Sequence, residues 1–236
     1  MSNYANHPNN SNLSNETPKP VWSTQDWILI GANALIFMAM FLIFNHQLPE
    51  QVASHYNING DQDRMMAKWS FWLMYGLIGV LLPAIISVSR LIDPRKNNYT
   101  RFQGYFDLMR WAISLFLQAI FLIVILDNTG HKLPALNLVM GGIGVLLIVI
   151  GNRMGQLRSN FFVGIRTPWA LMDEDNWRKT HRLGARMWVL CGLILFIAAW
   201  FAPAPWLAGI VIAAVAVCAG IPTLYSYLLF RGKSAS

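Results

Sequence analysis

The sequence predicts an all-α polytopic membrane protein with six transmembrane helices, both termini cytoplasmic, and a small extracytoplasmic cap between the first two helices. Hydrophobic residues make up 55% of the 236 positions and charged residues only 12%, whereas soluble domains carry roughly 25% charged residues. Mean hydropathy is +0.41. About 20 apolar residues cross a hydrocarbon core of ~30 Å. Six apolar stretches approach or reach this length, at roughly 26–45, 70–90, 108–126, 134–150, 187–204 and 206–229.

The distribution of basic residues predicts the orientation. Of the 18 Lys and Arg residues, 15 fall in the N-terminal tail, the 90–110 and 151–186 connections and the C-terminal tail. The other side of the membrane receives only Arg64, Lys68 and Lys132. By the positive-inside rule, the richer side is cytoplasmic. This asymmetry accounts for the net charge of +7, and we expect no direct binding of nucleic acid.

The predicted organisation follows the chain. Residues 1–22 form an Asn-rich cytoplasmic tail with too little apolar surface to fold, so we expect it to be disordered. Residues 23–105 hold the first two helices and the cap, 46–69. Residues 106–230 form a four-helix part with a long cytoplasmic loop, 151–186, and residues 231–236 form a short tail.

The cap is the one sizeable surface that is predicted to face outward. Val52 to Asn57 has strand character, and Asn59-Gly60 is a strong tight-turn signal. The spacing of its polar residues does not fit an EF-hand, because the glycine comes too early and no bidentate Glu follows. His46 and His55 alone are weak support for zinc. We therefore expect no metal or cofactor. An external ligand would meet the cap through four candidate residues, His55, Asn57, Gly60 and Asp61.

Within the 151–186 loop, turn and cap residues predict short local structures. Gly151-Asn152 is typical of a helix C-cap, and Thr167 followed by Pro168 is typical of a helix start. A second short helix is expected near Asp175.

The second short helix has two distinct faces. Trp177, His181 and Gly184 would share one face, and Arg178 would lie in a neighbouring basic row. Trp177 and Trp169 suit the lipid headgroup level, where the arginines would reach phosphates.

Arg166 follows an apolar run and should have an anionic or carbonyl partner. Asp107 is the candidate within the chain, and a ligand anion is the alternative. For His181, a role as a hydrogen-bonded interfacial side chain is favoured over that of a catalytic base, because no nucleophile with a supporting acid is evident nearby.

Several short motifs together resemble the SdpI family of bacterial membrane immunity proteins. The carrying motifs are Gly151-Asn152, Asn160, the run Gly164-Ile165-Arg166-Thr167-Pro168-Trp169, and Trp177-Arg178-Lys179-Thr180-His181. Leu48-Pro49, His55-Tyr56-Asn57, Gly60 and Asp61 resemble the small domain of unknown function that usually precedes the SdpI part. The resemblance implies a six-helix, non-enzymatic protein of the bacterial cytoplasmic (inner) membrane. Family members protect the cell from a secreted, membrane-damaging peptide toxin, and the best-known member also signals by holding a cytoplasmic repressor at the membrane.

The expected partners are thus the lipid bilayer, a peptide toxin outside and a repressor inside. The candidate ligand- or partner-binding residues on the cytoplasmic side are Asn160, Arg166, Thr167, Trp169, Trp177, Arg178 and His181. Two other function classes stay open. A small transporter or channel would need ionisable residues within its spans, whereas the mid-span polar residues are uncharged. A membrane enzyme acting on lipid or peptide would use His181, Arg166 and Asn160.

Overall fold

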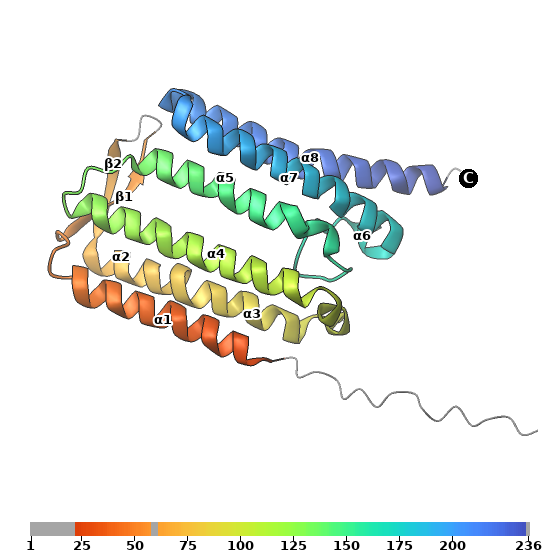
Figure 1. Ribbon diagram of the computed structural model, residues 1–236, viewed down its shortest axis with the longest axis horizontal. Coiled ribbons are helices and arrows are strands. Elements are labelled where there is room, and N and C mark those ends of the chain that lie inside the picture. Colours follow the sequence, from red (N-terminus) through yellow and green to blue (C-terminus); the bar gives the residue numbers. More distant parts are fainter. Residues whose placement is uncertain (1–21, 58–60, 235–236) are drawn as a thin grey trace, which may run out of the picture.

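The computed structural model describes residues 22–57 and 61–234, which form an elongated helical bundle with a small two-stranded sheet at one end (Figure 1). In this part of the chain, six helical segments are long and apolar enough to cross a membrane, which confirms the predicted class. These segments are Thr24–Phe44, Lys68–Ile92, Lys96–Asn128, Ala135–Gln156, Glu174–Phe201 and Ala204–Lys233.

The individual elements divide these spans further. The helices are α1 (Thr24–Phe44), α2 (Lys68–Tyr75), α3 (Leu82–Ile92), α4 (Tyr99–Asn128), α5 (Ala135–Arg153), α6 (Pro168–Met172), α7 (Glu174–Phe201) and α8 (Ala204–Ser234). A π-helical turn, Gly76–Leu81, joins α2 to α3, and 3₁₀ turns at Lys96–Asn98 and Met154–Gln156 precede α4 and follow α5. The Asn-rich tail and the Asn59-Gly60 turn lie outside the described residues.

The bundle has two different ends. The start of α1, the end of α8 and the connections 93–98 and 154–173 lie together at one end, which we call the basic end (Figure 1). The sheet lies at the opposite end. Strands β1 (Gln51–Tyr56) and β2 (Gln62–Ala67) pair in antiparallel fashion, as the strand pattern predicted.

The sheet is fixed to the helices through Asn128 at the end of α4. Its Oδ1 accepts a hydrogen bond from the Ala53 N–H (2.7 Å), and its Nδ2 donates to the Ala53 carbonyl (3.1 Å). Val52 is fully buried beneath the hairpin. These bonds satisfy the backbone of β1, so the cap is a part of the bundle and not a separate unit.

Glycines bring α5 and α7 into backbone contact. A Cβ atom on Gly144 would lie 2.7 Å from both the Gly192 carbonyl oxygen and the Phe196 nitrogen. Small residues allow such close approach between membrane helices, where packing replaces the hydrophobic effect. Gly151 has the same role against Trp188, and α5 continues past it to Arg153. The expected C-cap at Gly151-Asn152 is therefore wrong, because this glycine serves helix packing.

The polar residues in the middle of α1 and α4 bond to one another. Gln118 Nε2 donates to Asn33 Oδ1 (2.8 Å) and to the Gly79 carbonyl (3.0 Å), and the Tyr75 hydroxyl donates to Gln118. Gly79 lies in the π-helical turn, where the i→i+4 hydrogen-bond pattern of an α-helix is interrupted. The Gly79 carbonyl accepts its hydrogen bond from Gln118. These bonds join α1, α2 and α4 in the middle of the bundle.

Candidate functional site

The site is a loop, residues 157–167, that the Asn160 side chain holds in shape. Asn160 is fully buried. Its Nδ2 donates to the carbonyls of Arg158 (2.9 Å) and Val163 (3.0 Å), and its Oδ1 accepts from the N–H groups of Phe162 (3.0 Å) and Val163 (2.7 Å). One amide thus satisfies four backbone groups of a segment that has no regular structure. Asn160 is a structural centre of the loop rather than an exposed binding group.

Asp93 anchors the loop to the α3–α4 connection. Its buried carboxylate accepts hydrogen bonds from the N–H groups of Phe161 (2.9 Å) and Arg95 (2.7 Å) and from the Tyr99 hydroxyl (3.0 Å). Arg95 donates to Ser159 and also to the Leu171 carbonyl (3.0 Å). Asp93 was not predicted from the sequence, where its only local signal is an acidic residue directly before a proline at a helix end.

His181 anchors the loop to α7. Its Nδ1 faces the Trp177 carbonyl (2.8 Å) and its Nε2 accepts from the Ile165 N–H (3.0 Å). A ring nitrogen facing a carbonyl must donate, and one facing an N–H must accept, so the ring is the neutral Nδ1–H tautomer. Gly164 adopts φ +108°, and a Cβ there would collide with His181 Nε2. Both nitrogens are occupied by backbone, which fits the expected hydrogen-bonding role.

Thr167 anchors the loop to α7 and α8. Its hydroxyl lies 2.8 Å from Ser226 Oγ, and Ser226 donates in turn to Asn176 Oδ1 (2.6 Å). The Thr180 hydroxyl also donates to Asn176 Oδ1 (3.0 Å), and Thr167 accepts from the Ala170 N–H (3.2 Å) as the predicted N-cap of α6. All four polar side chains are buried. The loop is therefore bonded to three separate parts of the bundle.

Arg166 has a carbonyl partner, one of the kinds expected, whereas the partner proposed for it within the chain and the place expected for Trp177 are wrong. Asp107 pairs with Arg110, so it is not the partner of Arg166. The exposed Arg166 donates instead to the Phe161 carbonyl (2.6 Å). Trp177 is buried, donates to the Leu157 carbonyl (3.0 Å) and stacks on His181 at 4.1 Å between centroids. Its expected place at the lipid headgroups is wrong, because its indole N–H satisfies a loop carbonyl.

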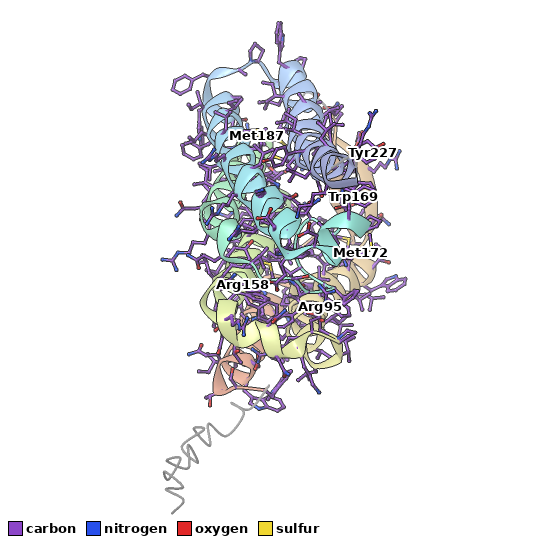
Figure 2. All side chains as sticks on the ribbon, turned by 90° about the vertical axis from the view of Figure 1, so that its right-hand side faces the viewer. Arg95, Arg158, Trp169, Met172, Met187 and Tyr227 are labelled. Carbon is purple, nitrogen blue, oxygen red and sulfur yellow. The ribbon has the colours of Figure 1, made fainter. Side chains whose placement is uncertain are left out.

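Trp169 packs against the end of α8. Its ring lies 5.3 Å from that of Tyr227 and 6.0 Å from that of Phe230, and Figure 2 shows it beside Tyr227 at the basic end. It is half-buried, and its indole N–H has no hydrogen-bond partner among the described residues. Trp169 thus joins the start of α6 to α8.

The expected second short helix is the first part of α7, which runs unbroken from Glu174 to Phe201. Asp173 is its N-cap and accepts from the N–H groups of Asp175 (2.8 Å) and Asn176 (3.4 Å). The hydrogen bond from Lys233 lowers the pKa of the Asp173 carboxyl. Trp177, His181 and Gly184 share one face as predicted, and that face is buried. Arg178 is exposed and pairs with Asp175 (2.7 Å).

A buried ion cluster next to the loop was not predicted. The Asp26 carboxylate of α1 accepts from Arg90 of α3 and from Arg110 of α4, and Arg110 also pairs with Asp107. Asp26 and Arg110 are fully buried. Ser87 accepts a further bond from Arg110 (2.8 Å). Two carboxylates oppose two guanidiniums, so the cluster is formally neutral, as buried charges require. These four ionisable residues lie in the membrane-spanning segments and bond to one another.

Of the four cap candidates, His55, Asn57 and Asp61 are distant from this loop, at the opposite end of the bundle. His55 Nδ1 lies 2.5 Å from Asp63 Oδ1. The Asp61 N–H donates to Asn57 Oδ1 (3.0 Å), which closes the described flanks of the turn. Gly60 lies outside the described residues. In the ranges 22–57 and 61–234, no group of three or more His, Cys, Asp or Glu side chains is arranged to hold a metal ion.

Asn160→Ala is expected to loosen the loop. The change removes the partner of four backbone groups, of which the N–H and carbonyl of Val163 are buried, and each buried group left unbonded costs about 1–3 kcal/mol unless the loop opens to water. We expect trypsin to cut after Arg158 and Arg166 at least about tenfold faster, which corresponds to about 1.4 kcal/mol for local opening. Asn152→Ala is the control, because Asn152 is exposed. Equal cleavage of the two variants would contradict the role given to Asn160.

Comparisons with known proteins agree with the motifs. Residues 156–226 match the SdpI/YfhL protein family, and residues 34–79 match a domain of unknown function (DUF1648). The chain is 32% identical over 113 residues to the protein named Immunity protein SdpI of Bacillus subtilis (strain 168), an overlap of 48% of this chain and 54% of that protein. The chain thus spans about half the length of this relative. No solved structure matches. The resemblance to the SdpI family is confirmed, and the chain is a multi-pass protein of the bacterial inner membrane.

Proposed function

We propose that this chain, which carries the segments that match SdpI/YfhL and DUF1648, is a non-enzymatic immunity protein. It protects the bacterium from a secreted, membrane-damaging peptide toxin. The toxin meets the hairpin cap and the neighbouring helix ends outside the cell. Both termini and the 157–167 loop lie in the cytoplasm, where the loop surface contacts a repressor.

One observation carries this proposal. The segment that matches SdpI/YfhL, 156–226, coincides with the hydrogen-bonded loop and the two helices to which it is anchored. The relative that shares part of this sequence is named an immunity protein. His181 of α7, which anchors the loop, has both ring nitrogens bonded to backbone, an arrangement that supports a binding surface rather than general base catalysis.

Toxin survival tests the proposal directly. A toxin-sensitive bacterium that expresses the chain is challenged with an SdpC-type peptide toxin, and survivors are counted against the empty vector. We expect survival to rise at least about tenfold. Absence of protection at a normal membrane level would contradict the proposal and would favour a transporter.

The His181→Ala variant separates binding from catalysis. We expect it to protect in proportion to the amount of folded protein in the membrane, because His181 supports the loop through hydrogen bonds. The measurement is survival per unit of membrane protein on a quantitative immunoblot. A complete loss of protection at an unchanged protein level and unchanged trypsin resistance would instead favour an enzyme.

A further inference from the structure

Two apolar grooves meet at the 157–167 loop. The first, of about 540 Å³, lies between α3 and α4, and its lining includes Phe162 and Val163 of the loop. The second, of about 500 Å³, lies along α5, α7 and α8, and its lining includes Ile165, Arg166 and Thr167 of the loop. We call them the α3–α4 groove and the α5–α8 groove. Gly164 lines both, so the loop is a thin partition between them.

Both grooves are built from membrane-spanning helices. The α3–α4 groove is lined by Ala84, Ile85 and Ile113, and the α5–α8 groove by Leu147, Val215 and Ala219, among other apolar residues. Val215 is 62% exposed and Ile85 54% exposed. Within a bilayer, such openings face hydrocarbon and not water.

Arg166 lies at the partition. It lines the α5–α8 groove. Its guanidinium donates to the carbonyl of Phe161 (2.6 Å). Phe161 directly precedes Phe162, which lines the α3–α4 groove. A guanidinium carries five N–H donors. Among the described residues, the Phe161 carbonyl is the one acceptor bonded to it. An exposed cation with free donors therefore stands between the ends of two apolar grooves.

We propose that a two-chain anionic phospholipid of the surrounding bilayer binds across this loop. Its phosphate binds Arg166, and one acyl chain lies in each groove. A guanidinium matches phosphate with paired charge-assisted hydrogen bonds. A single helix, about 10 Å across, from a second copy or a peptide would lie in one groove and leave the other open. A phospholipid has two acyl chains joined at one headgroup. It therefore matches two grooves that one loop separates, with the cation Arg166 at the separating loop.

Native mass spectrometry of the full chain tests this binding. The protein is released from nanodiscs of equal parts phosphatidylglycerol and phosphatidylcholine, and the retained lipid is counted. We expect one phosphatidylglycerol per chain, and about tenfold less of it with Arg166→Gln, because the variant cannot form charge-assisted hydrogen bonds with the phosphate; tenfold corresponds to about 1.4 kcal/mol. Arg182→Gln is the matched control, because Arg182 is exposed on α7 and lines neither groove. It should retain lipid as the unmodified chain does.

Groove-filling variants test the two-chain geometry. Ala84→Phe fills the α3–α4 groove and Ala219→Phe fills the α5–α8 groove, and each is expected to reduce retention of phosphatidylglycerol. Lysophosphatidylglycerol, which has one chain, should be retained less than the two-chain lipid. Three results would overturn the proposal: equal retention of the two phospholipids, equal retention by Arg166→Gln, or a lipid-free dimer. Circular dichroism of each variant shows that it is folded, and toxin survival is scored separately, so this test and that of the proposed function fail independently.

Discussion

Asp26→Asn is expected to destabilise the protein by about 3–5 kcal/mol, since it leaves two buried arginines without their shared carboxylate. Asp26 bonds to both Arg90 and Arg110 and also accepts from the Ser23 N–H at 2.6 Å. An asparagine keeps the shape of the side chain but removes the charge. The cluster would then hold two guanidiniums against the single carboxylate of Asp107. The measurement is equilibrium unfolding in mixed micelles with a rising fraction of sodium dodecyl sulfate, followed by tryptophan fluorescence.

The control for this change lies in the same cluster. Among the described residues, Arg110 is the one ion-pair partner of Asp107, whose side chain is 24% exposed, so Asp107→Asn leaves a site that water can reach. Its effect should be clearly smaller than that of Asp26→Asn. Equal effects of the two variants would mean that burial of the shared carboxylate is not what stabilises this end of the bundle.

Gly144→Val is expected to cost about 3 kcal/mol or more, because it drives α5 and α7 apart. The new Cβ would lie 2.7 Å from the Gly192 carbonyl oxygen and the Phe196 nitrogen. Both neighbours are backbone atoms, which cannot turn aside as a side chain can. The same detergent titration measures the loss.

Gly209→Val serves as its matched control. Gly209 lies in α8, where a Cβ would meet nothing within 4 Å, so the control carries the same loss of glycine and the same change of helix propensity. We expect it to unfold as the unmodified protein does. A comparable loss in both variants would show that the intrinsic preference of glycine, rather than the contact of α5 with α7, sets the effect.

Much of the fold could be predicted because its signals are local. The six spans follow from the length of the apolar runs, and the start of α6 follows from Thr167-Pro168. The first part of α7 reads as a polar loop segment, because Arg178, Arg182 and Arg186 interrupt its hydropathy. It stays helical because these arginines share an exposed face while Trp177 and His181 share the buried one.

The contacts of the site could not be predicted, because they join distant positions. Asp26 is 64 residues from Arg90 and 84 from Arg110. Asp93 is 68 residues from Phe161. In the sequence, Asp26, Arg90 and Arg110 are ordinary charged residues near helix ends. Only the packing of α1, α3 and α4 brings them together. The side-by-side placement of Trp177, His181 and Gly184 was predictable, whereas their common contact with the loop was not.

The length of α7 connects the inside of the membrane with its surface. Its 28 residues extend about 42 Å at ~1.5 Å per residue, which is longer than a hydrocarbon core of ~30 Å. A helix of this length does not lie wholly within the core, and its polar first half, with the exposed Arg178 and Arg182, is the part that leaves it. The loop is bonded to that same half through His181. One continuous helix therefore joins the loop to the contact with α5 at Gly192.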